Sequence, residues 1–256
     1  MKAYYLIFFV VTLSCCSDEA ILDGTKIVSI KHSENPLGLL PKAKEWEEKF
    51  FYNDFGTIVK MSETLSPASY RAFEYNQNGR LFRIMRYDET TNSILSRDSL
   101  TYIGNAQYQD RLLIFSKNLL VNPIIYRYYY DSIGQLVQRE TITAPLNQVT
   151  VLEKYFWADG NIVRKQTYRY NPNRFLAYEF FYEYDSKINY KKDKPMYISD
   201  PLSQTKNNVV KESFNDHYGD WEALCNPCTT DYKYNASSLP FLINASWGSR
   251  IEIKYE

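Results

Sequence analysis

Two cysteines late in the chain have a spacing at which thiols do chemistry. Cys225 and Cys228 are separated by two residues, as in zinc sites, redox pairs and short disulfides. A structural zinc site requires four ligands, and we find only His217 and Asp216 nearby as candidates for the other two. A thioredoxin-like pair precedes a helix, whereas residues 232–234 alternate as in a strand. We favour a short disulfide, with free thiols as the second alternative and metal or redox chemistry as the third.

Other groups that could support catalysis show no matching motif. His32 and His217 lie far apart in the sequence, and the chain contains no GxSxG, HExxH or phosphate-loop motif. Acid pairs such as Asp216 and Asp220 occur, but such spacings are expected by chance among 30 Asp and Glu residues. We therefore expect no catalytic residues, no bound metal and no cofactor.

The first residues have the features of an export signal. Lys2 is followed by an apolar run from Ala3 to Leu13, which is shorter than the roughly 20 residues that span a bilayer. A buried N-terminal strand is the alternative. Residues 13–16, Leu-Ser-Cys-Cys, resemble the lipobox of bacterial lipoproteins, with Cys16 as the lipidated residue and Cys15 as the alternative. We expect residues 1–15 to be a signal peptide and residues 16–23 a lipidated tether.

Two further sequence patterns concern export. Residues 17–19, Ser-Asp-Glu, resemble the acidic signal that sends lipoproteins of Bacteroidota to the cell surface. Ser99 and Ser132 each stand between an Asp and an apolar residue, which matches the three-residue O-glycosylation pattern of exported Bacteroidota proteins. Coincidence is the alternative for both serines.

A repeated turn motif organises residues 24–256. In four places an aromatic residue is followed within a few positions by Asn or Asp and then by glycine, at Gly56, Gly79, Gly134 and Gly160. The Asn or Asp side chain can cap a turn, and the glycine can adopt a positive φ, as in a type I turn with a G1 bulge. Three further sites begin in the same way but lack the glycine: Tyr170-Asn171, Tyr184-Asp185 and Tyr234-Asn235.

These units predict an all-β fold. A repeat of about 27 residues holds two strands, which gives about 14 to 16 strands in a single curved antiparallel meander, open or partly closed like a barrel. Residues 26–30 read as the opening strand, residues 251–256 as the closing strand, and the end of residues 41–50 as a further strand. Residues 193–230, which are rich in proline and polar residues, are predicted to form a long loop.

Aromatic residues are abundant, with 24 Tyr, 14 Phe and 4 Trp. In a Tyr-x-Tyr pair on a strand both rings share one face, because successive side chains alternate. Such pairs could form an exposed ligand platform, and our candidates are Tyr128, Tyr130, Tyr168 and Tyr170. The alternative, that the same rings form the core, is the more common arrangement.

The Tyr-Asp-x-x-Gly units resemble YD repeats, which form β-shells in large secreted toxins. The chain resembles more closely a family of Bacteroidota surface lipoproteins of unknown function, described as having a porin-like β-fold. Three features match that family in the same order: the lipobox, the spaced hairpins and the segment 181–190. Residues 203–211 resemble the run that precedes the final hairpin in that family. The resemblance covers most of residues 24–256, but Cys225 and Cys228 have no counterpart in it. It implies no activity.

The charge balance limits the partners. Lys plus Arg and Asp plus Glu both number 30, so phosphate is not attracted at long range and nucleic acid is not an expected partner. Charges such as Arg80, Arg83 and Arg86 interrupt both faces of the predicted sheet, unlike the lipid-facing strands of a true porin. We expect membrane contact through the lipid anchor alone, at the outer membrane and facing the cell exterior.

Two functions remain. The leading hypothesis is a non-enzymatic binding or scaffold module with a glycan or peptide ligand, since the sequence combines a repeat sheet with many rings and lacks a catalytic motif. The alternative is a hydrolase of surface glycans whose two carboxyl groups the sequence does not identify.

Overall fold

The computed structural model describes residues 26–35, 38, 42–65, 68–103, 106–115, 119–120, 124–143, 148–170, 173–192, 194–219 and 225–256, without the side chains of 106–115 and 119–120. Most of these residues form strands. The strands are β1 (Ile27–Glu34), β2 (Lys44–Tyr52), β3 (Ile58–Glu63), β4 (Ser69–Tyr75), β5 (Leu81–Asp88), β6 (Ile94–Ile103), β7 (Ala106–Phe115), β8 (Leu119–Leu120), β9 (Ile124–Tyr130), β10 (Leu136–Thr143), β11 (Gln148–Ala158), β12 (Asn161–Tyr170), β13 (Arg174–Ile188), β14 (Asn207–Asp216), β15 (Cys228–Tyr234), β16 (Pro240–Ala245) and β17 (Ser249–Tyr255). No helix in the described part of the chain is long and apolar enough to cross a membrane.

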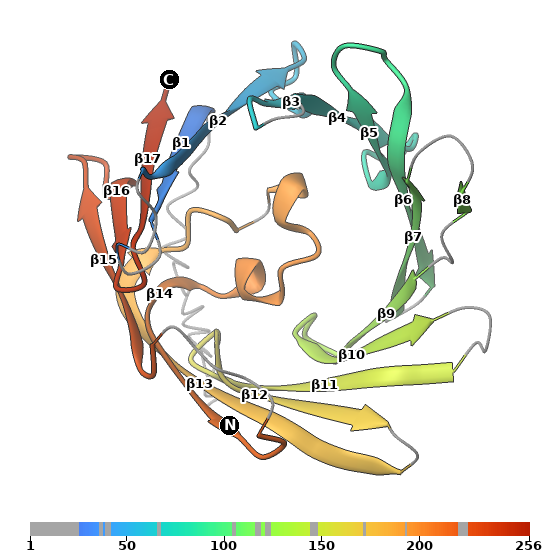
Figure 1. The fold of residues 1–256 in the computed structure, drawn as a ribbon, viewed down its shortest axis with the longest axis vertical. Helices are drawn as coiled ribbons and strands as arrows, with labels where there is room; N and C mark the ends of the chain where they lie inside the picture. The colour runs from blue at the N-terminus through green and yellow to red at the C-terminus, as the bar shows by residue number, and fades with distance from the viewer. Residues whose placement is uncertain are drawn as a thin grey trace, which may run out of the picture.

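The strands form one antiparallel sheet in chain order, and Figure 1 shows it curling into a ring. β9 pairs with β7 past the two-residue β8, and β1 pairs with both β2 and β17. The join between β14 and β15 is narrow, with the residue pairs Lys211–Thr229 and Glu212–Cys228 only. The prediction of an all-β domain made of one curved antiparallel meander is confirmed. Of the two shapes considered, these pairings correspond to the partly closed one.

The hairpin turns follow the predicted chemistry. The side-chain oxygen of Asn53 accepts hydrogen bonds from the N–H groups of Phe55 and Thr57, at 3.1 and 2.9 Å, and Gly56 adopts a φ of 76°. The pairing of β2 with β3 shifts by one residue beside this turn, as a G1 bulge requires. The turns at Gly79 and Gly134 repeat the arrangement.

Two turns depart from this scheme. Asp159 and Gly160 both have positive φ, 51° and 77°, so β11 and β12 are joined by a two-residue turn of the type I′ kind rather than by a G1-bulge loop. The turn that begins at Asn235 lacks a glycine, and Ser238 takes the positive φ, 60°, in its place.

We call the end of the ring where these hairpin turns lie the turn end. Aromatic side chains also connect neighbouring strands at this end. Among the described residues, seven aromatic side chains donate a hydrogen bond, 2.6–3.0 Å long, to a carbonyl near the start of the preceding strand of the ring. The donor–acceptor pairs are Tyr52–Ile27, Tyr75–Ile58, Tyr102–Leu81, Trp157–Leu136, Tyr184–Ile162, Tyr232–Val209 and Tyr255–Pro240. Each bond joins two strands whose loop lies at the opposite end, which we call the loop end.

The connection between β13 and β14 is much longer than the other turn-end connections. We call residues 189–192 and 194–206 the inner segment; it contains the 3-10 helices η2 (Pro195–Tyr197) and η3 (Pro201–Gln204) and lies inside the ring in Figure 1. The prediction of one long loop over residues 193–230 is therefore wrong. β14 occupies the middle of that range and pairs with β13 from Ile188–Asn207 to Tyr178–Asp216.

The residue pairs between neighbouring strands show which side chains lie on the same face of the sheet. Tyr128 lies opposite Arg139, Arg139 opposite Glu153, and Glu153 opposite Thr167, so these side chains share one face. That face is the inner one, because Arg139 donates to the carbonyl of Ser199 in the inner segment at 3.2 Å. Two buried clusters lie on the wall. One is centred on β1 to β6 with β16 and β17, and the other on β9 to β13.

Candidate functional site

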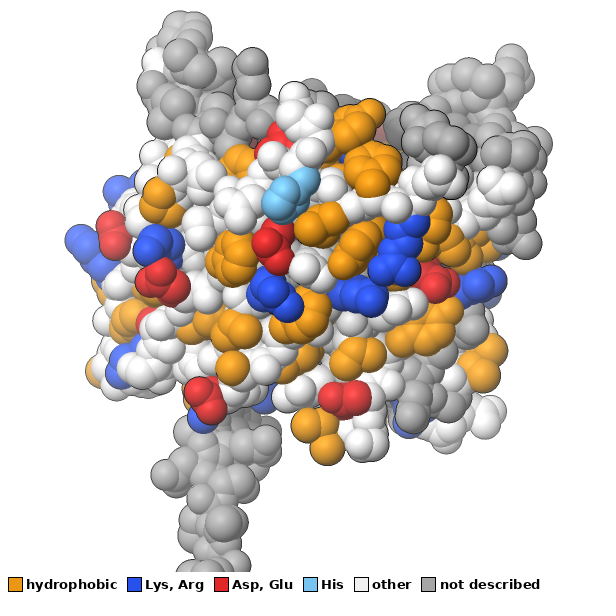
Figure 2. Space-filling view, turned by 90° about the horizontal axis from the view of Figure 1, so that it is seen from below, with side chains coloured by type: hydrophobic (Ala, Val, Ile, Leu, Met, Phe, Trp, Pro, Cys, Tyr) orange, Lys and Arg blue, Asp and Glu red, His pale blue; other side chains and the backbone are white. Residues whose placement is uncertain are grey.

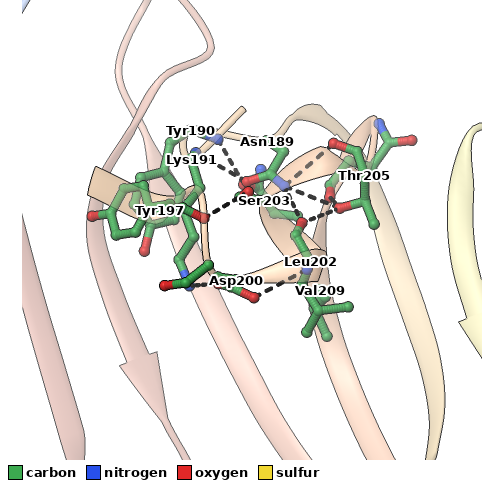
Figure 3. Close-up of polar contacts among 12 residues, drawn as sticks. Asn189, Tyr190, Lys191, Tyr197, Asp200, Leu202, Ser203, Thr205 and Val209 are labelled. Carbon is green, nitrogen blue, oxygen red and sulfur yellow. Dashed lines mark hydrogen bonds and ion pairs between the residues drawn. The ribbon is translucent and has the colours of Figure 1, made fainter. Parts of the chain in front are cut away.

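Side-chain amides tie the two ends of the inner segment to each other and to the start of β14. The amide nitrogen of Asn189 donates to the carbonyl of Leu202 at 2.8 Å and to the hydroxyl of Thr205 at 3.0 Å (Figure 3). The amide nitrogen of Asn208 donates to the carbonyl of Ile188 at 3.1 Å, and its oxygen accepts from the N–H of Tyr190 at 3.2 Å. The side chains of Asn189, Thr205 and Asn208 are buried, so these bonds hold the segment in one position.

The tip of the inner segment is a compact aromatic and charged cluster. The ammonium group of Lys191 lies 3.1 Å from the carboxylate of Asp200 and near the rings of Tyr190 and Tyr197. Burial lowers the pKa of Lys191, but Tyr190 and Asp200 raise it by more, so the group stays charged. Burial also raises the pKa of both tyrosines. This cluster stabilises the segment.

A second charged network lies on the inner wall facing the segment. The guanidinium of Arg139 contacts the carboxylate of Glu153, which also accepts from the hydroxyl of Tyr155 at 3.0 Å and lies 3.8 Å from the ammonium of Lys165. Burial raises the pKa of Tyr155. Because Glu153 is 6% exposed, its charge requires these partners. The network links β10, β11 and β12 to the inner segment.

Between the inner segment and the turns lies a pocket of about 770 Å³, the turn-end pocket. The rings of Tyr52, Tyr75 and Tyr130 line one side, and Lys192 and Gln204 of the inner segment line another. The hydroxyls of Tyr52 and Tyr75 are bound to carbonyls, and burial raises the pKa of Tyr75 to about 12. The described lining residues include no Asp, Glu, His or Cys. The pocket therefore offers ring surfaces, amide and hydroxyl groups, and amines.

Cys225 and Cys228 form a disulfide, as favoured from the sequence. It lies beside the narrow β14–β15 join. The side chain of Asn226 accepts from the N–H of Phe214 at 3.1 Å and donates to its carbonyl at 2.7 Å. Asn226 therefore bonds to β14 as a neighbouring strand would, and the loop 225–228 extends the join.

The four candidate platform tyrosines do not form one exposed stripe. Tyr128 is 1% exposed and belongs to a core cluster, and Tyr130 packs against that cluster and bonds to Gln204 of the inner segment at 3.3 Å. Tyr168 follows the inner-facing Thr167, so it lies on the outer face, and Tyr170 on the same face is 36% exposed. The common-stripe prediction is wrong, because the two pairs fall on opposite faces of the sheet.

The remaining predicted residues lie apart. Ser132 is exposed in the Gly134 turn, whereas Ser99 is half-buried within β6. His32 stacks on Trp46 near the loop end of β1 and β2, far in sequence from His217, which follows β14. Cys15 and Cys16 lie outside the described residues. Within the described residues, no group of three or more His, Cys, Asp or Glu side chains is placed to hold a metal ion.

Sequence reasoning missed the inner segment and its pockets. The available signal was Tyr184-Asp185 without a following glycine. The carboxylate of Asp185 accepts from the N–H of Lys187 at 2.9 Å, as in the other units, but β13 continues to Ile188 without a tight turn. The same carboxylate also accepts from the N–H of Asn208 at 3.1 Å and contacts the hydroxyl of Tyr234. The missing glycine alone is not a sufficient signal, because the turn at Asn235 also lacks one and closes with Ser238 at a positive φ.

No protein-family model and no curated protein matches this chain. A porin-like protein from Bacteroides vulgatus is similar in structure, at 12% identity and a TM-score of 0.45, covering 90% of this chain and 98% of that one. A porin-like protein from Bacteroides uniformis matches at 7% identity with the same TM-score and coverage. A chain in the complex of TcdB2, TccC3 and Cdc42 matches at 14% identity and a TM-score of 0.33, covering 80% of this chain and 13% of that one. Similarity at these levels concerns the fold and identifies no activity.

Proposed function

We propose that this chain is a lipid-anchored cell-surface protein whose strand ring is a non-enzymatic binding module for a glycan or a peptide. The observation that carries the proposal is the turn-end pocket. It is large enough for a sugar residue or a peptide side chain, since small-molecule sites typically measure about 300–1,000 Å³. Its walls come from the hairpin turns and from the inner segment, which the buried amides hold in place.

The chemistry of the pocket suits a polar ligand with a flat apolar surface. The hydrogen bonds of Tyr52 and Tyr75 to the wall fix the orientation of their rings, so a ligand can stack on them at little entropic cost. Gln204 and Lys192 offer hydrogen bonds and positive charge. An uncharged or acidic ligand is favoured over a basic one.

The outer face supports a location outside the bilayer. Ion pairs cross neighbouring strands on this face at 2.9 Å for Arg83–Glu74, 3.6 Å for Arg164–Glu179 and 2.6 Å for Lys211–Glu183. Figure 2 shows charged side chains lying among the hydrophobic ones on one side of the ring. Each Lys or Arg placed at the middle of a bilayer would cost about 2–4 kcal/mol. The lipid anchor is then the membrane attachment.

The experiment is a glycan and peptide array with the chain lacking residues 1–16, followed by affinity measurement for the strongest ligand. Replacing Lys192→Glu should weaken that ligand about tenfold or more, because it reverses a charge at the pocket. Lys206→Glu is the matched control. It makes the same change in the same segment, at an exposed residue that does not line the pocket.

Equal affinities for the Lys192 variant and for the control would contradict the assignment of the pocket. Release of shorter sugars from any array glycan would instead favour the hydrolase. That outcome would require a pair of carboxyl groups about 5–10 Å apart in another cleft.

A further inference from the structure

A second cavity, which we call the loop-end cavity, lies on the other side of the inner segment. It measures about 190 Å³ and is bounded by β14, β15, β16 and β17 and by residues 189–191. It exists because β14 and β15 separate after the pair Lys211–Thr229. Towards the turn end the hydroxyl of Tyr232, which reaches the carbonyl of Val209 at 3.0 Å, bridges the separated strands.

One acid lines this cavity. Glu212 lies opposite Tyr182, whose side chain is buried in the wall cluster, so Glu212 also projects inward. Among the described residues its carboxylate makes no hydrogen bond and no ion pair within 4 Å. Burial raises the pKa of Glu212, Lys165 lowers it and Asp200 raises it. A half-buried carboxylate in this position would gain from a cationic partner.

The rest of the lining is largely apolar. Val209, Ile243, Ile251 and the half-buried Trp247 surround the space next to Glu212. Lys191 also lines the cavity, but its ammonium is held by Asp200 at 3.1 Å, which offsets its positive charge. The cavity thus combines one negative group with apolar walls.

We propose that the loop-end cavity binds a small organic amine, with its ammonium group on the carboxylate of Glu212 and its apolar body between Trp247 and the aliphatic wall. The cavity volume limits this ligand to a single ring or a short chain. The site is separate from the turn-end pocket, so the two assignments can fail independently.

The test uses the purified full-length chain and two probes of nearly equal size, 2-phenylethylamine and the uncharged 2-phenylethanol, in isothermal titration. The amine should bind about tenfold to a hundredfold more tightly, which is the range of a charge-assisted hydrogen bond. Glu212→Gln should reduce the affinity for the amine to that for the alcohol and leave the alcohol unchanged. Glu183→Gln is the matched control, since it removes an outer-face carboxylate paired with Lys211.

A second variant guards against misfolding of the first. Ala245→Leu adds volume at the cavity wall and should abolish binding of both probes while leaving the far-UV spectrum unchanged. Equal affinities of the two probes for the unaltered chain would overturn the proposal. So would an unchanged preference for the amine in Glu212→Gln, or no binding of either probe at millimolar concentration.

Discussion

At the scale of single residues, the abundant tyrosines have a structural role. Several of those that precede a turn donate a hydrogen bond to a carbonyl of the preceding strand of the ring, for example Tyr75 to Ile58 at 2.8 Å. At the turn end of the ring, the glycine turns connect every second pair of neighbouring strands. The aromatic hydrogen bonds connect most of the remaining pairs at the same end. The repeat therefore encodes a turn and a cross-strand bond together.

Stability should depend on these rings according to their burial. Tyr75→Phe removes one hydrogen bond and should lower the free energy of unfolding by about 0.5–1.5 kcal/mol. Tyr128→Ala should cost about 3 kcal/mol or more, because the ring is 1% exposed. Tyr170→Ala, at 36% exposure, should cost less than about 1 kcal/mol. Urea unfolding followed by tryptophan fluorescence measures all three, and similar losses for Tyr128→Ala and Tyr170→Ala would contradict the assignment of faces.

Alkaline pH should destabilise the domain through the same side chains. Burial raises the pKa of Tyr75 and of Tyr128 to about 12. Both states keep these hydroxyls protonated below the ordinary tyrosine pKa of about 10, so the full stability is present there. Above that pH the unfolded chain ionises first, and stability falls as the pH rises towards 12. The urea midpoint should be flat between about pH 8 and 9.5 and decline beyond pH 10.

Lipidation is a prediction about two residues. Replacing both Cys16→Ala and Cys15→Ala should release the protein from the membrane fraction of its host, because stable anchoring needs the acyl chains. A double variant that fractionates like the unaltered chain would exclude the anchor.

At the scale of elements, the local turn rules were predictable and the faces were not. Asn53 and Gly56 define their turn by their own chemistry, so the sequence alone predicted it. The face of Tyr168 relative to Tyr128 depends on which residues pair across β9 to β12. Bulges with one extra residue, in β11 and in β12, shift that pairing further along the strands. The inner segment depends on contacts such as Asn189–Thr205 and Arg139–Ser199, which no local pattern contains.

The turn at Ser238 offers a test of the turn rule. A residue with a side chain pays a steric penalty at positive φ, so Ser238→Gly should stabilise the domain by up to about 1 kcal/mol. The reverse change, Gly134→Ser at a φ of 81°, should destabilise it by a similar amount. Thermal unfolding of the two variants compares them, and shifts of the same sign would contradict the rule.

The narrow β14–β15 join should depend on its disulfide. Replacing Cys225→Ser and Cys228→Ser frees the loop whose Asn226 bonds to Phe214, and a loop this short contributes about 2 kcal/mol or less. Hydrogen exchange should accelerate in residues 211–216 and 228–231 and stay unchanged in β12. Equal acceleration in both regions would indicate global rather than local opening.

At the scale of the whole molecule, the charged outer face predicts behaviour in water. The chain lacking residues 1–16 should remain in solution without detergent and give a far-UV spectrum dominated by strand. A requirement for detergent, or a large helical signal, would contradict the placement outside the bilayer.

The position of the chain ends has a further consequence. Lys26 bonds to Glu256 and its side chain lies 3.7 Å from the position of a Cβ at Gly56, so the described domain begins and finishes at the turn end. If Cys16 carries the lipid, ten Cα-to-Cα steps separate it from Lys26, which gives a reach of at most about 35 Å. This connection would therefore keep the turn end within about 35 Å of the membrane surface. With such an anchor, a small amine would reach the loop-end cavity directly from the medium, whereas a ligand for the turn-end pocket would have to pass through the gap above the lipid headgroups.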